Sequence, residues 1–157
     1  MKKAIFFSAL FLAAFGFASF SADAQTVRVS GAFEKSPVSR GRSVDATIVM
    51  NIPSQLHVNS NRPASEYAIP TVVSVRSPGL KTGRIRYPRG KNRRFQFSEN
   101  QINVYEGRVK FPFTITVPSN FRGNLIRVIA TVRYQPCTNE VCYPPTSKSV
   151  TMTARVN

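Results

Sequence analysis

The stretch Ile126-Arg-Val-Ile-Ala-Thr-Val-Arg-Tyr134 decides the fold class, because apolar side chains occupy every second position. In a β-strand such positions point to one face, so the alternation indicates a half-buried strand. Residues 44–50, 109–117 and 150–156 alternate in the same way. Eleven prolines and eight glycines separate these runs, and no run has the period of an amphipathic helix. The sequence therefore predicts an all-β protein, an immunoglobulin-like β-sandwich.

One of these predicted strands contains a proline. Pro112 lies in the middle of the run 109–117 and has no backbone N–H to donate to a neighbouring strand. We therefore expect this strand to lie at a sheet edge, or to carry a bulge at Pro112.

The N-terminus has the parts of a secretory signal peptide. Two lysines follow Met1, an apolar run extends from Ala4 to Phe20, and Ala22-Asp-Ala24 forms a small-x-small cleavage site. We expect cleavage after Ala24, so that residues 1–24 are a signal peptide and residues 25–157 form a single domain in the periplasm or otherwise outside the cytoplasm. Because the apolar run is slightly long, an uncleaved membrane anchor is the alternative.

The charge is strongly positive, with a formal net charge of +15. Because export is predicted, we expect no nucleic-acid partner, and acidic protein surfaces or anionic envelope surfaces are favoured instead. Residues 81–94 are rich in lysine and arginine and contain no acid. Pro88-Arg-Gly90 suits a turn, which predicts a solvated hairpin here. Docking of a partner is the functional alternative, with these candidate residues: Arg89, Lys91, Arg93 and Arg94.

The two cysteines, Cys137 and Cys142, follow the strand that ends at Tyr134. A disulfide closing so short a loop removes little entropy from the unfolded chain, and a domain of this size does not need one. A loop between two strands places the sulfurs at a rim of the sandwich, where thiols can reach them. A redox pair and a static staple both remain open. A copper site with His57 lacks the usual ligand spacing, so we predict no metal and no cofactor. No residue pattern of a hydrolase is present.

The segment Tyr134-Gln-x-Cys137-x4-Cys142-Tyr-Pro-Pro145 resembles the N-terminal periplasmic domain of DsbD, a thiol:disulfide interchange protein. Residues 56–61, 66–71 and 105–112 fit the same family in order. The resemblance implies an immunoglobulin-like fold and a reversible disulfide. It also implies an electron carrier of the thiol–disulfide oxidoreductase type, whose partners are thioredoxin-like proteins or a membrane electron carrier. Donor and acceptor would be separate proteins, and we expect a monomer.

The resemblance also implies roles for single residues. Cys142 would form the mixed disulfide with a partner, and Cys137 would resolve it. Well-known family members have tyrosines where His57 and Asn59 fall, and an acidic, aromatic cap loop where this chain has residues 95–100. The candidate residues around the sulfurs are His57, Asn59, Phe97, Glu99, Tyr134 and Tyr143. The rival hypothesis is a non-catalytic immunoglobulin-like adaptor with a structural disulfide and a basic partner-binding face.

Overall fold

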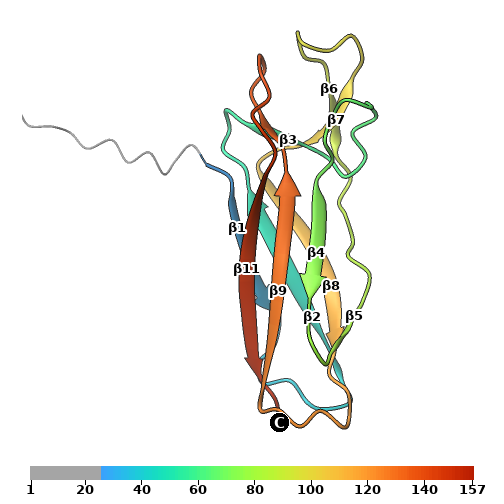
Figure 1. Ribbon diagram of the computed structural model, residues 1–157, viewed down its shortest axis with the longest axis vertical. Helices are drawn as coiled ribbons and strands as arrows, with labels where there is room; N and C mark the ends of the chain where they lie inside the picture. The colour runs from blue at the N-terminus through green and yellow to red at the C-terminus, as the bar shows by residue number, and fades with distance from the viewer. Residues whose placement is uncertain (1–25) are drawn as a thin grey trace, which may run out of the picture.

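The computed structural model describes residues 26–157, in which antiparallel strands form two packed layers and no helix is present (Figure 1). The predicted signal peptide, residues 1–24, lies outside the described residues. Within the described part, no helix is long and apolar enough to cross a membrane. The prediction of an all-β sandwich is confirmed.

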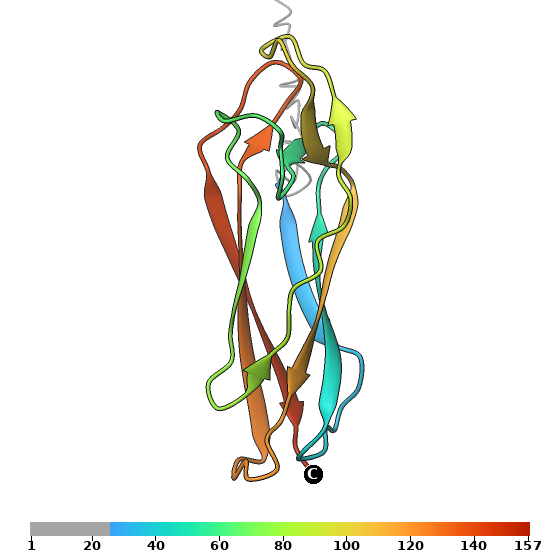
Figure 2. The same cartoon turned by 90° about the vertical axis from the view of Figure 1, so that its right-hand side faces the viewer.

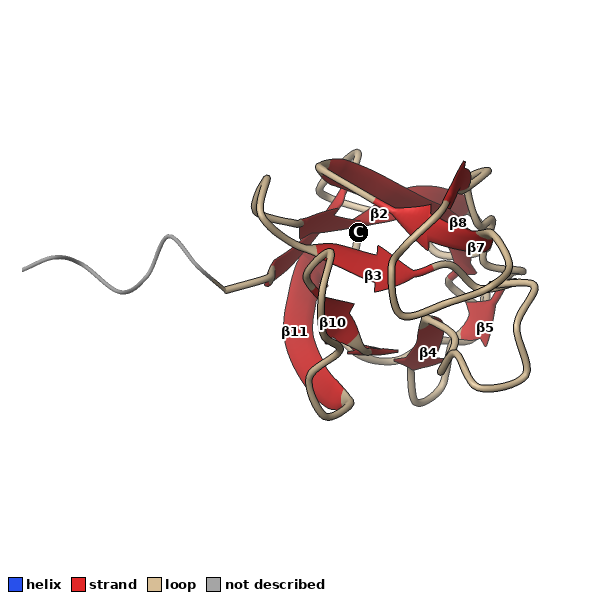
Figure 3. Ribbon diagram, turned by 90° about the horizontal axis from the view of Figure 1, so that it is seen from above, coloured by secondary structure: helices blue, strands red, loops and turns tan. Residues whose placement is uncertain are grey.

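The strands form three sheets. The first layer has the strand order β1 (Arg28–Phe33), β2 (Ser43–Asn51), β8 (Arg108–Thr116), β5 (Lys81–Thr82). The second layer has the order β11 (Thr146–Arg155), β9 (Leu125–Tyr134), β4 (Val72–Arg76). A smaller end sheet has the order β10 (Pro136–Cys137), β3 (His57–Asn59), β7 (Ile102–Tyr105), β6 (Lys91–Arg93). This end sheet lies at the end of the sandwich opposite the C-terminus (Figures 1 and 3).

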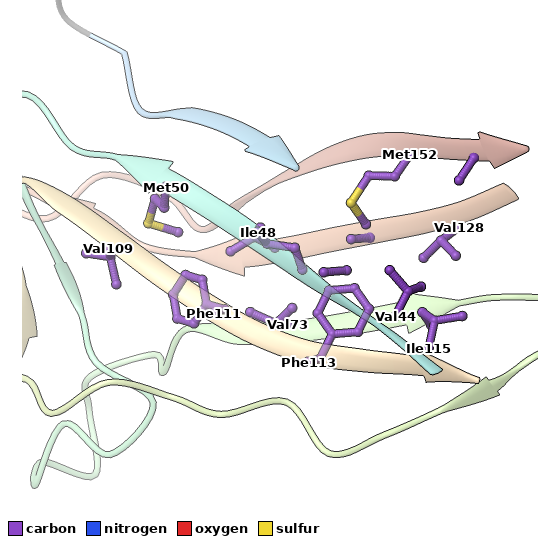
Figure 4. Close-up of a cluster of buried hydrophobic side chains, with 14 of the residues drawn as sticks. Val44, Ile48, Met50, Val73, Val109, Phe111, Phe113, Ile115, Val128 and Met152 are labelled. Carbon is purple, nitrogen blue, oxygen red and sulfur yellow. The ribbon is translucent and has the colours of Figure 1, made fainter. Parts of the chain in front are cut away.

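The alternating runs supply the core between the layers. Burial alternates residue by residue along β2, β8 and β9, as the sequence pattern predicts. Figure 4 shows the rings of Phe111 and Phe113 on β8 among the aliphatic side chains of the other strands, Val128 of β9 included. Both rings are almost completely buried. Full burial of such a side chain stabilises a fold by about 1.5–3 kcal/mol, so the apolar face of each strand fixes its orientation.

Pro112 lies in a part of β8 that pairs with β2 on one side and, within residues 26–157, has no strand on the other. The pairing of β2 with β8 continues without a bulge past Pro112, and β5 pairs with β8 only at Ile115 and Thr116. The carbonyl oxygen of Pro112 accepts a hydrogen bond from the Arg86 N–H at 3.0 Å, so its backbone faces away from β2. The missing N–H therefore interrupts no ladder, and the edge alternative is the one observed.

The predicted hairpin in residues 81–94 is wrong. β5 pairs with β8 and β6 pairs with β7, so residues 83–90 cross from the first layer to the end sheet (Figure 2). Tyr87 holds this crossover in place. Its ring meets Phe111 edge-on with centroids 5.6 Å apart, and its hydroxyl oxygen accepts a hydrogen bond from the Val73 N–H at 2.8 Å. The turn-forming residues Pro88 and Gly90 thus serve a connection between sheets.

Candidate functional site

The disulfide closes a tight hairpin between β9 and β11. Cys137 and Cys142 lie opposite each other with Cα atoms 4.0 Å apart, and their sulfurs are bonded. Backbone hydrogen bonds flank the pair on both sides, from Thr138 N–H to the Val141 oxygen at 2.8 Å and from Tyr143 N–H to the Pro136 oxygen at 2.9 Å. The bridge therefore lies at the rim, between the two strands that the sequence indicates.

The two cysteines differ in exposure. Cys137 is completely buried, because β10 pairs with β3 at this position, whereas Cys142 is only partly buried. Thiol–disulfide exchange needs access along the S–S bond to the attacked sulfur. Cys142 is therefore the more accessible of the two cysteines.

His57 on β3 lies directly beside Cys137 on the neighbouring strand β10. The two residues are partners in the register of β3 and β10, which places their side chains on the same face. His57 is 3% exposed, and its Nε2 atom has no hydrogen-bond partner among the described residues. Burial lowers the pKa of His57, and the negative charge of Glu106 opposes that shift only in part. The imidazole is therefore neutral at neutral pH.

Aromatic rings of the cap loop, residues 95–100, cover His57. The Phe95 ring stacks on the His57 ring with centroids 4.1 Å apart, and Phe97 stacks on Phe95 at 5.2 Å. Phe95 is buried and Phe97 is 41% exposed. Glu99 is exposed and forms no hydrogen bond or ion pair with residues 26–157. The loop thus brings Phe97 into the site's aromatic stack, and Phe95 as well, but not Glu99.

Asn59 anchors the cysteine hairpin through hydrogen bonds. Its side-chain amide donates to the Ile69 oxygen and to Gln135 Oε1, both at 3.1 Å. Gln135 in turn donates to the Tyr143 oxygen at 3.2 Å, one residue after Cys142. Gln135 is not among the site residues that the sequence predicts. Its place in the cysteine motif, next to Tyr134, is the signal that could have identified it.

Asn59→Ala is expected to lower the free energy of unfolding by about 1–3 kcal/mol, since it leaves the part-buried Ile69 carbonyl and Gln135 without their donor. Chemical denaturation of the oxidised protein measures this. Asn92→Ala is the matched control, because Asn92 is exposed and accepts its one side-chain hydrogen bond at the surface. Equal effects of the two substitutions would contradict an anchoring role for Asn59.

The two candidate tyrosines flank the cysteine pair in the chain. Tyr134 is buried, which raises its pKa, and Tyr143 is 47% exposed. Together with Leu56 and Pro136 they line a hollow of about 620 Å³ beside the bridge. Both tyrosines therefore shape the surface that surrounds the disulfide.

The basic candidates separate into two pairs. Arg93 donates two hydrogen bonds to the Glu106 carboxylate, each 2.8 Å long, and Lys91 donates one at 3.3 Å. The Arg93 hydrogen bonds are the largest cause that lowers the pKa of Glu106 to about 2. Arg89 and Arg94 are exposed and form no ion pair with the described residues. Glu106 therefore balances part of a charge that looks unopposed in the sequence.

Known proteins resemble this chain in sequence and in fold. Residues 23–154 match the family model described as "Thiol:disulfide interchange protein DsbD, N-terminal". No curated protein matches the sequence. Among solved structures, the N-terminal periplasmic domain of ScsB from Proteus mirabilis has a TM-score of 0.55 and 12% identity. The match covers 84% of this chain and 48% of that chain, so this protein spans about half the length of the ScsB structure.

The GAE domain of GGA2p from Saccharomyces cerevisiae is a more distant match, with a TM-score of 0.43 and 11% identity over 81% of this chain and 86% of that chain. The likeness to ScsB supports the sandwich fold, and the family model spans all of β1 to β10 and nearly all of β11. The chain belongs to the DsbD N-terminal family.

Proposed function

We propose that this protein is an exported thiol–disulfide exchange domain that passes electrons between thioredoxin-like proteins, or other redox proteins of the cell envelope. Membership of the DsbD N-terminal family supports a role in thiol–disulfide exchange. The observation that carries the proposal is the unequal burial of the two cysteines in one rim disulfide. A structural disulfide does not require an accessible cysteine. A carrier needs one sulfur that a partner thiolate can attack and a second sulfur that leaves.

The exchange proceeds in two steps. A thiolate of the reduced partner attacks the Cys142 sulfur, a partner–Cys142 disulfide forms, and the Cys137–Cys142 bond breaks. Its electron pair leaves with Cys137, which takes up a proton. The second thiolate of the partner then attacks the partner's own sulfur in the mixed disulfide and releases Cys142. The partner has lost two electrons, and this protein carries them as a dithiol until an oxidised acceptor reverses the sequence.

His57 is proposed to act on the leaving cysteine. Its neutral ring lies opposite Cys137 in the strand register, and its buried Nε2 has no partner. Such a ring can exchange a hydrogen bond with the Cys137 thiol that reduction creates. The stacked rings of Phe95 and Phe97 hold the imidazole in this position.

The proposal predicts that a reduced thioredoxin-like protein reduces the disulfide roughly 100-fold faster than glutathione at equal thiol concentration, since docking positions the attacking thiolate. Alkylation of newly formed thiols followed by mass spectrometry measures the rate. A Cys137→Ala/Cys142→Ala double variant is the control and should consume no reductant. Equal rates with both reductants, together with unfolding on reduction, would favour the non-catalytic adaptor with a structural disulfide.

A further inference from the structure

β4 and the crossover at residues 83–90 run side by side along the sandwich (Figure 2). A groove lies between them. Its volume is about 1350 Å³. Val73 and Val75 of β4 line one wall, and the crossover lines the other. None of the cysteine hairpin, residues 137–142, lines the groove, so it is separate from the disulfide.

The groove carries concentrated positive charge. Four arginines line it and no aspartate or glutamate does; they are Arg62, Arg84, Arg86 and Arg89. All four are exposed, and their guanidinium groups form no ion pair or side-chain hydrogen bond with residues 26–157. A guanidinium presents a planar fork of donors that matches a carboxylate. The groove therefore offers four guanidinium groups that can bind carboxylates, three of them on the crossover.

The β4 wall is also an open strand edge. β4 pairs with β9 on one side only. The Val73 N–H bonds to Tyr87, so the backbone of Val73 faces the groove. Backbone groups alternate in direction along a strand, and the N–H and C=O of Val75 therefore face the groove as well. The Tyr87 hydroxyl already occupies the backbone groups of Val73, so an extended chain lying there can pair with this edge at Val75.

We propose that the groove binds an extended, acidic segment of a partner protein. Its carboxylates would meet Arg84, Arg86 and the other two arginines, and its backbone would pair with the edge at Val75. Lipid headgroups and anionic glycans offer the charge without an alternating row of N–H and C=O groups. The inference concerns a surface away from the disulfide and does not rest on the proposed redox function.

Fluorescence anisotropy with a labelled peptide of four Glu-Thr repeats tests the proposal. The full protein should bind this peptide with an affinity that falls as salt rises. Arg84→Gln/Arg86→Gln should weaken binding about tenfold or more. Arg127→Gln/Arg155→Gln, which removes the same charge from exposed positions of β9 and β11, should change affinity less than about twofold. Equal losses in the two variants would overturn the groove as the binding site.

Two further probes separate backbone pairing and partner class. A peptide with proline in place of threonine keeps the charge but loses N–H donors, and it should bind several-fold more weakly. Equal binding would overturn the strand-edge pairing.

Vesicles of phosphatidylglycerol are the lipid probe. If the protein binds these vesicles through Arg84 and Arg86 but does not bind the peptide, the proposal of a protein partner is overturned. The Cys137→Ala/Cys142→Ala variant should bind the peptide as the unchanged protein does, and loss of binding there would overturn the independence of the two surfaces.

Discussion

Cys137→Ala is expected to accumulate a mixed disulfide with a thioredoxin-like partner, whereas Cys142→Ala is expected to accumulate almost none. Cys142 is partly exposed and keeps its thiol in the first variant. In the second variant the remaining thiol, Cys137, is completely buried beneath the pairing of β10 with β3. Because exchange requires access to the thiolate, the adduct should form about 100-fold more slowly through Cys137 than through Cys142.

The measurement uses a partner with a single remaining active-site cysteine, activated as a disulfide with thionitrobenzoate. Attack by Cys142 releases the coloured thiolate and leaves the two proteins joined. The reduced protein with both cysteines is the control, because Cys137 should then release the partner and no adduct should accumulate. Adduct formation through Cys137 in place of Cys142 would reverse the two roles. If neither variant forms an adduct and both unfold, the bridge is a structural staple.

Phe111→Ala is expected to lower the free energy of unfolding by about 3–5 kcal/mol, the usual cost of removing a fully buried ring. Phe111 is 0% exposed and lies between the two layers. Its ring also meets Tyr87 and Tyr105 edge-on, with centroids 5.6 Å and 5.9 Å away. Because Tyr87 holds the crossover and Tyr105 bonds to Asn61 and Pro88, the substitution should loosen the groove wall as well.

Urea denaturation of the oxidised protein measures the Phe111 effect. Phe97→Ala is the matched control, since it removes the same ring from an exposed position in the cap loop. We expect the control to cost less than about 1 kcal/mol. A similar loss in both variants would show that the interface between the layers is not the main source of stability.

The sandwich could be predicted from the sequence because strand alternation is a local signal. Residues 44–50, 109–117, 126–134 and 150–156 fall within or at the ends of β2, β8, β9 and β11. The crossover could not be predicted, because Pro88 and Gly90 indicate a change of direction without saying which strands lie on either side. The contacts that decide it, Tyr87 with Val73 and Arg93 with Glu106, join residues 13 or 14 positions apart.

The candidate site was only partly predictable for the same reason. The motif gave the disulfide and its place at the rim, and the strand register brings His57 to Cys137. The function of Asn59 depends on a hydrogen bond to Gln135, 76 residues away, which no local pattern indicates. The roles of the individual site residues stay predictions until the variants are measured.

The strand order of the end sheet bears on the rate of thiol–disulfide exchange. Its strand order places β10, with Cys137, at one edge and β6 at the other, next to Arg89 and Gly90 of the groove. Three strand spacings of about 4.8 Å separate those edges by about 14 Å, which about five extended residues span. If the acidic segment belongs to a redox partner, binding in the groove would present that partner's thiolate to Cys142 at an effective concentration in the millimolar range. A segment remote from the partner's own cysteine would then select the partner, and salt would slow exchange without any change at the sulfurs.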